Sequence, residues 1–150
     1  MLLSKSCIYG LRASLFLAAD KSGEYVSIRK MSEALGISFH FLTKILQQLT
    51  AANLMESYKG PKGGVRLLIP AKKITFLEIV VAIDGPDLLT ECALGLPGCG
   101  IDKPCPMHKS WAKTRDNIRD MLKNTTLEYL AKEGKSKNLR LSEEGGFDWL

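Results

Sequence analysis

The 150-residue sequence has few cysteines, few aromatic residues and no long hydrophobic run, and each shortage excludes a class of protein. Four cysteines are too few for the disulfide framework of a small secreted domain. The apolar stretch Leu15–Ala19 is shorter than a signal-peptide core or a membrane span requires, and Lys5 and Arg12 precede it. The sequence therefore predicts a reduced, cytoplasmic protein that does not contact a membrane.

Recognisable catalytic motifs are also missing. The sequence has no Ser-His-Asp set, no phosphate-binding loop and no paired acid motif, and its cysteines form no Cys-x-x-Cys pair of the kind that thiol oxidoreductases use. We therefore expect neither an enzyme nor a small-molecule substrate. The length is that of one ordinary domain with a helix or two added, which is enough to bury a core.

Positive charge is concentrated in the first half of the chain. Residues 1–70 contain nine Lys and Arg against four Asp and Glu, whereas residues 71–150 contain twelve of each kind. The formal net charge of +5 therefore comes from the N-terminal half. A basic half joined to a neutral half is typical of a polyanion-binding unit with a second function attached, although ordinary surfaces also vary this much.

The basic half has the start and stop signals of a winged helix-turn-helix unit. A first helix is predicted over 6–19, Ser27 caps a second helix that ends at Gly36, and Ser38 caps a third over 39–53. Two β-prone segments, 54–59 and 65–69, are separated by GPKGG and predict a hairpin. This order of elements favours a DNA-binding unit over an ordinary helix pair beside a surface hairpin.

The third helix has an apolar inner face, which begins at Phe39, and a polar outer face. Side chains that hydrogen-bond to base edges or phosphates gather on the outer face, so we expect it to enter the major groove. The residues predicted to face DNA there are Ser38, His40, Thr43, Lys44 and Gln47. The hairpin residues predicted to contact phosphates or the minor groove are Lys59, Lys62 and Arg66.

The second half begins with the best-marked helix start, a capping box of Thr75 and Glu78 that opens a helix over 74–85. After the cysteines, a helix with Trp111 and Arg115 on one face is predicted, and Thr125 with Glu128 suggests another capping box. The fold class is thus mainly α with a small β-hairpin. The predicted divisions are a DNA-binding unit (1–70), a helical unit with the cysteine segment (71–133) and a flexible tail (134–150).

Three cysteines and a histidine lie in a glycine- and proline-rich segment with the spacing C-x6-C-x5-C-x2-H; they are Cys92, Cys99, Cys105 and His108. Thiolates and imidazole are ligands of soft transition metals, but the short Cys-x2-4-Cys knuckle of structural zinc sites is missing. Wide spacings over an irregular segment suit an iron–sulfur cluster, and a zinc ion or cluster-free redox thiols are the alternatives. Cys7 lies in a helical pattern and is predicted to be a small buried apolar residue.

Together these motifs resemble the IscR/NsrR/CymR-type family of bacterial winged-helix regulators. The similarity extends to about residue 133 and includes LSKSCIYGLRA, GISFHFLTKILQQL, YKGPKGGVRLL, ITFLEIVVAID, the cysteine segment and the helix that contains Trp111. The resemblance implies a homodimer, held by the long helix after the cysteines, that binds palindromic operators in double-stranded DNA. It also implies a 2Fe–2S or 4Fe–4S cluster that controls DNA affinity.

By position, the resemblance implies that Cys92, Cys99 and Cys105 hold the cluster and that His108 is the histidine ligand of the 2Fe–2S members. A 2Fe–2S cluster is therefore expected over a 4Fe–4S cluster, although the first cysteine gap is one residue longer than in cluster-binding members. Nitric-oxide-responsive relatives use an acidic ligand near position 8, where this sequence has Ile8 and, beside it, Cys7 as a candidate additional ligand. The alternative is a winged-helix regulator with structural zinc or a cluster-free thiol switch that acts through a partner protein.

Overall fold

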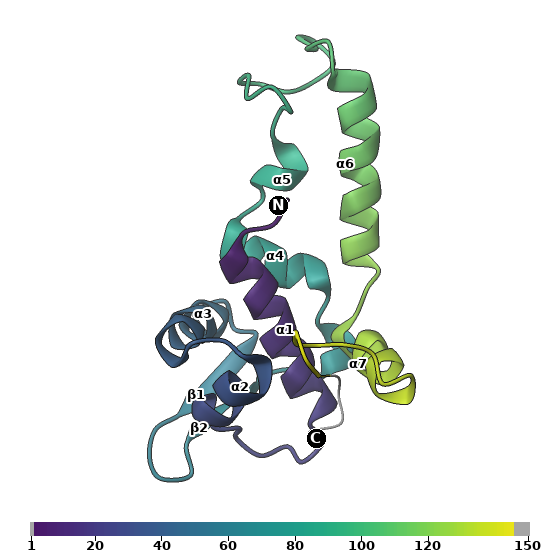
Figure 1. Ribbon diagram of the computed structural model, residues 1–150. Coiled ribbons are helices and arrows are strands. Elements are labelled where there is room, and N and C mark those ends of the chain that lie inside the picture. The colour runs from purple at the N-terminus through teal and green to yellow at the C-terminus, as the bar shows by residue number, and fades with distance from the viewer. Residues whose placement is uncertain (1, 146–150) are drawn as a thin grey trace.

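A computed structural model of the protein describes residues 2–145 as a helical body from which one long helix and the cysteine segment project (Figure 1). The elements are α1 (Lys5–Ala19), α2 (Ile28–Leu35), α3 (Phe39–Ala51), β1 (Met55–Tyr58), β2 (Gly64–Leu67), the 3-10 turn η1 (Ala71–Lys73), α4 (Phe76–Asp84), α5 (Asp87–Thr90), α6 (His108–Lys123) and α7 (Leu127–Ser136). The predicted mainly α fold with a small hairpin is confirmed. No helix in residues 2–145 has the length and apolar character that crossing a bilayer requires.

The helix-turn-helix forms where the capping signals predict it. The Ser27 side chain accepts a hydrogen bond from the Lys30 amide at the start of α2, and Ser38 accepts one from the Phe41 amide at the start of α3. Between them Gly36 adopts a left-handed conformation with φ of 67°, which glycine reaches without a steric penalty. These two caps and one glycine fix the turn that orients α3 on the body.

The hairpin is an antiparallel pair in which Met55 is opposite Leu67 and Tyr58 is opposite Gly64. Val26, in the segment before α2, adds a bridge to Val65 on the other edge of β2, through amide–carbonyl hydrogen bonds of 2.8 and 2.9 Å. Because two-stranded hairpins are marginally stable alone, the added bridge to Val26 helps to hold the wing on the helical body.

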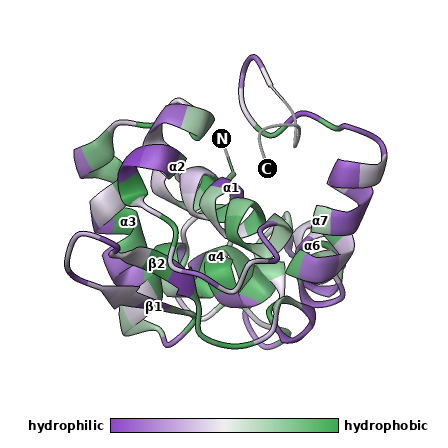
Figure 2. Cartoon of the chain, turned by 90° about the horizontal axis from the view of Figure 1, so that it is seen from below, coloured by the Kyte–Doolittle hydropathy of each residue, from purple (hydrophilic) through white to green (hydrophobic). Residues whose placement is uncertain are grey.

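The hydrophobic core surrounds α1, which contacts α2, α3, α4 and α7 (Figures 1 and 2). A Cβ atom on Gly10 would overlap the Ile83 side chain, so glycine permits the close approach of α4 to α1. Phe16 and Leu127 are completely buried in the same core. The core is therefore continuous across residue 70, where the sequence predicts a domain boundary.

The predicted start of the last helix, the Thr125–Glu128 capping box, is wrong by one residue. Thr126, not Thr125, caps α7, and its side chain accepts a hydrogen bond from the Tyr129 amide at 3.2 Å. Thr126 also forms an isolated bridge with Thr75, in which the Phe76 amide donates to the Thr125 carbonyl. This tertiary pairing, which local sequence does not reveal, decides which of the two threonines is the cap.

The structure also differs from the sequence prediction at residue 134. Gly134 is buried within α7, which continues to Ser136, and Leu141 is buried in the core beyond the helix. Gly134 and Leu141 therefore pack on the body, residues 135–140 between them are exposed, and the remainder of the predicted tail, 146–150, lies outside the described residues. Phe39 was predicted to lie on the apolar inner face of the third helix. In the structure it occupies the first position of α3 and its side chain is 36% exposed.

Candidate cysteine centre and DNA-binding surface

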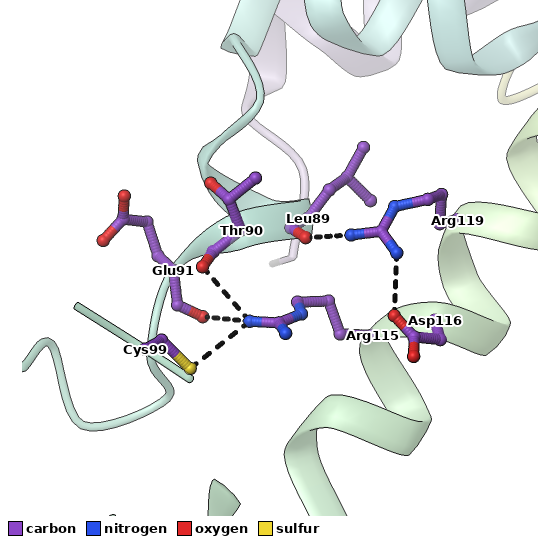
Figure 3. Close-up of polar contacts among 7 residues, drawn as sticks. All are labelled: Leu89, Thr90, Glu91, Cys99, Arg115, Asp116 and Arg119. Atoms are coloured by element: carbon purple, nitrogen blue, oxygen red, sulfur yellow. Dashed lines mark hydrogen bonds and ion pairs between the residues drawn. The ribbon is translucent and has the colours of Figure 1, made fainter. Parts of the chain in front are cut away.

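Polar contacts to main-chain carbonyls join α5 and the residue after it to the projecting helix α6 (Figure 3). Trp111 Nε1 donates to the Glu91 carbonyl at 2.8 Å, and Arg115 Nη1 donates to the Thr90 and Glu91 carbonyls at 3.1 and 3.2 Å. Arg119 donates to the Leu89 carbonyl. We call Trp111, Arg115 and Arg119 the α6 clamp. Their spacing of four residues places them on one helical stripe, so one face of α6 holds the C-terminal end of α5.

The cysteine loop, residues 91–107, returns from α5 to the first residue of α6. It brings the thiol of Cys92 to 3.4 Å from the thiol of Cys105, and the thiol of Cys99 to 3.6 Å from Nδ1 of His108. Arg115 of the clamp reaches the Cys99 sulfur as well, at 3.5 Å (Figure 3). The four predicted ligand residues are therefore gathered at the N-terminal end of α6 as two neighbouring pairs.

The two thiols of the first pair have opposite electrostatic surroundings. Hydrogen bonds from the backbone amides of Leu94 and Leu96 lower the pKa of Cys92, and the neighbouring thiols of Cys105 and Cys99 add to this effect. Burial, and next the contact with Cys92, raise the pKa of Cys105. A deprotonated sulfur is consequently favoured at Cys92 first, which is the form that binds metal.

The donor set fits an iron–sulfur cluster chemically, because it combines three soft thiol ligands with one imidazole. Donors also surround the sulfurs: the Leu94 amide lies 3.4 Å from the Cys92 sulfur, and the Arg115 guanidinium lies beside Cys99. The Nε atom of Arg115 is buried without a hydrogen-bond partner. Within residues 2–145, no three Cys, His, Asp or Glu side chains converge as ligands of one metal ion would.

Cys7 lies apart from this centre, in the core side of α1. It is completely buried, as predicted for a core residue. Burial, and next the carboxylate of Asp84, raise the pKa of Cys7 to about 12. Asp84 also accepts hydrogen bonds from the amide and hydroxyl of Ser4, which caps α1. Because ligand thiols must be deprotonated, this placement favours the core role over the ligand role.

The structure leaves most of the predicted DNA-facing side chains open to solvent. The exposed residues of this set are Ser38, His40, Lys44, Gln47, Lys59 and Lys62. Thr43 is partly buried and its hydroxyl donates to the Phe39 carbonyl at 2.7 Å. The α3 residues form one outward face, and the two lysines lie on the wing that follows it in the chain.

Arg66 differs from the two wing lysines because its guanidinium is already engaged. It pairs with Glu56 at 2.5 Å, donates to the Gly23 carbonyl at 3.0 Å and lies 4.3 Å from the centre of the Tyr25 ring. The residues predicted to face DNA do not include Arg29, an exposed basic residue in the first turn of α2. Its guanidinium lies 5.2 Å from the centre of the Phe39 ring. Its position just after the Ser27 cap was the available signal.

The sequence predicted the donors of the α6 clamp only in part and did not predict their acceptors. The helical spacing of Trp111 and Arg115 predicts one shared face, and the structure confirms that face. Their main-chain acceptors are the carbonyls of Thr90, the last residue of α5, and of Glu91, which follows it. No sequence signal predicted α5, a four-residue helix. Contacts to main-chain groups carry no side-chain signature, so this half of the arrangement needed the tertiary structure.

The fold and the cysteine centre together define a class, a winged-helix regulator that carries a thiol- and imidazole-rich appendage. Comparison with known proteins gives the family: residues 3–133 match the model of the Rrf2 family, described as iron-dependent transcriptional regulators. The chain belongs to the Rrf2 family of transcription regulators.

Individual relatives agree with this assignment. Protein aau3 of Rhizobium meliloti is 34% identical over 146 residues, which are 96% of this chain and 94% of that protein. The structure of CymR (YrzC), the global cysteine regulator of B. subtilis, is similar with a TM-score of 0.75 and 27% identity, over 87% of this chain and 96% of that one. The structure of T. potens IscR shares the fold, with a TM-score of 0.70 and 22% identity over 90% of each chain.

Proposed function

We propose that this regulator is a homodimer that binds a palindromic operator and that Cys92, Cys99, Cys105 and His108 hold an iron–sulfur cluster that controls its DNA affinity. The observation that carries the proposal is that the loop places Cys92 beside Cys105 and Cys99 beside His108, the first residue of α6. The family description as iron-dependent regulators supports the same reading. Three thiolates and one histidine are four ligands of the kinds that a 2Fe–2S cluster takes, and we propose that type over 4Fe–4S.

The exposed surface of α6 supports the dimer. Leu122 near its end is buried, and the clamp stripe faces α5, which leaves the opposite side uncovered. That side carries an uncharged exposed stripe of Ser110, Thr114, Asn117 and Met121. Helices pack closely along stripes of small, uncharged residues with an apolar anchor, and Met121 is 60% exposed in the single chain.

DNA contact would follow from the wing and α3. The exposed outer face of α3 would read base edges in the major groove through His40, Lys44 and Gln47, with Ser38 and Thr43 at its N-terminal end. Lys59 and Lys62 would contact phosphates. Arg66 would act mainly by stiffening the wing, because Glu56 and the Gly23 carbonyl already hold its guanidinium.

A bound cluster would be a regulatory ligand whose presence depends on iron supply and on oxidants. The chain's own contacts give a route from the loop to the DNA-binding helix. The clamp holds α5, Gly85 and Pro86 join α5 to α4, and Asp84 at the end of α4 binds Ser4 at the start of α1. An ordered loop would fix α4 against α6 and thereby set the separation of the two α3 helices on operator half-sites, which are roughly 34–36 Å apart.

Anaerobic purification from iron-replete cells tests the cofactor directly. We expect brown protein with visible absorption, together with iron and acid-labile sulfide in equal amounts. Cys92→Ser, Cys99→Ser and Cys105→Ser should each lose the colour, whereas Cys7→Ser, the matched control, should keep it. Colourless protein without sulfide would refute the cluster, and one zinc per chain in its place would establish the zinc alternative.

Operator binding tests the regulatory role. Selection from random duplexes with the purified protein identifies a site, and its affinity is then measured for the cluster-loaded and cluster-free forms. We expect the two forms to differ in affinity or in sequence preference. Equal affinity and equal preference would overturn the sensing role while leaving DNA binding intact.

A further inference from the structure

The cysteine loop contains one pair of thiols in direct contact. The sulfurs of Cys92 and Cys105 lie 3.4 Å apart, and an S–S bond is about 2.05 Å long, so bond formation requires roughly 1.4 Å of movement. Both residues lie in an irregular segment between α5 and α6, where side-chain rotations supply movements of that size. Cys99 is the competing partner, but its sulfur contacts His108 and Arg115.

We propose that the cluster-free protein is oxidised at a specific site, an intramolecular Cys92–Cys105 disulfide that leaves Cys99 as a free thiol. The oxidant is a peroxide. It oxidises one thiol of the pair to a sulfenic acid and is reduced to one molecule of water. The second thiol attacks that sulfur, forms the S–S bond and releases a second molecule of water. Two thiols thus lose two electrons and two protons, and one hydrogen peroxide becomes two waters.

The position of Cys99 explains the selectivity. Arg115 donates to its sulfur at 3.5 Å while donating to the Thr90 and Glu91 carbonyls, so the clamp fixes Cys99 to α6. Cys92 and Cys105 have no such tie to the clamp and face one another across the loop. In the proposed function both of these sulfurs are cluster ligands, and on that condition the disulfide and the cluster exclude one another.

Peptide mapping tests the pairing without reference to the cluster. Reduced, cluster-free protein is treated with one equivalent of hydrogen peroxide, its free thiols are alkylated, and it is cleaved before aspartate. Cleavage before Asp102 places Cys105 on one peptide and both Cys92 and Cys99 on another, and tandem mass spectrometry locates the alkylated cysteine. We expect a cross-linked pair of peptides in which Cys99 carries the alkyl group.

Three variants keep the test falsifiable. Cys99→Ser should form the cross-link with unchanged yield, Cys105→Ser should lose it entirely, and Cys7→Ser, the control, should behave like the parent. A cross-link from Cys99, a Cys92–Cys99 bond within one peptide, or a bond between chains on a non-reducing gel would overturn the proposal. So would the absence of any disulfide.

Cluster reconstitution then tests the exclusion separately. The oxidised protein should take up iron and sulfide only after treatment with dithiothreitol, whereas the reduced protein should take them up at once. Equal uptake by both forms would refute the exclusion. If neither form takes up a cluster, the proposed cofactor fails, while the peptide map still decides the disulfide.

Discussion

The winged-helix body and the cysteine lobe, formed by α5, the cysteine loop and α6, are stabilised by different physical means. In the body, side chains such as Phe16, Leu42 and Ile79 are completely buried in one apolar core. In the lobe, Arg and Trp side chains of α6 hold carbonyls of α5 and of Glu91, and apolar loop residues lie in solvent, with Ile101 89% exposed. Figure 1 shows the lobe projecting from the body.

This difference separates a self-sufficient scaffold from a lobe that, in the proposed function, gains order from a bound cluster. Burial of apolar area stabilises the body whether or not a ligand is present. Apart from Leu89, Cys92 and Leu122, the apolar side chains of the lobe are at least partly exposed. Few buried apolar contacts are the character of the low-stability regions of proteins. In the proposed function, this division would let the loop respond to a cluster while the DNA-binding fold persists.

Truncation of one apolar side chain in each region gives the largest contrast. Phe16→Ala removes a fully buried ring from the body and should lower the free energy of unfolding by about 3–5 kcal/mol. Ile101→Ala in the exposed loop should change it by no more than about 0.5 kcal/mol. Urea denaturation followed by circular dichroism measures both. Similar losses in the two variants would break the comparison.

Removal of a clamp side chain should loosen the lobe alone. Arg115→Met deletes hydrogen bonds from a charged group, each worth about 1.5–3 kcal/mol, to the Thr90 and Glu91 carbonyls. Amide hydrogen exchange in residues 87–105 of the cluster-free protein should accelerate roughly ten- to a hundredfold, while exchange in α1 and α3 stays unchanged. Uniform acceleration throughout the chain would show that the lobe and body open together.

The corrected cap of α7 offers a smaller test within the body. Thr126→Ala removes the acceptor for the Tyr129 amide and should destabilise the protein by about 1 kcal/mol. Thr125→Ala is the matched control, since the Thr125 hydroxyl donates to the Met121 carbonyl and caps no helix. Thermal unfolding of the two variants distinguishes them, and a greater loss for Thr125→Ala would contradict the assignment.

The smallest expected effect is on DNA affinity, from a substitution in the wing that leaves the stability of the fold unchanged. Lys59→Gln should weaken binding to many duplexes similarly and reduce the slope of log affinity against log salt by about 0.9, the value for one phosphate contact. Lys72→Gln in η1 is a charge-matched control outside the wing, and it should leave the slope unaltered. Fluorescence anisotropy over a range of salt concentrations gives the slopes. An unaltered slope for Lys59→Gln would remove its phosphate role.

Local signals in the sequence were enough for the body. The Ser27 and Ser38 caps, the left-handed turn at Gly36 and the Thr75–Glu78 capping box all form where they are predicted, because each depends on contacts within four residues. Local signals did not predict that Thr126, and not Thr125, caps α7, because a bridge to a segment about fifty residues earlier decides it.

For the candidate centre, the sequence by itself determined which chemical groups are available: three thiols and one imidazole on a segment too rich in glycine and proline for regular structure. Only the tertiary structure decided how they pair, with Cys92 beside Cys105 and Cys99 held between His108 and Arg115. The reason is that side-chain chemistry is encoded residue by residue. The pairing is set by α6, whose clamp binds main-chain carbonyls that every residue possesses and no sequence motif marks.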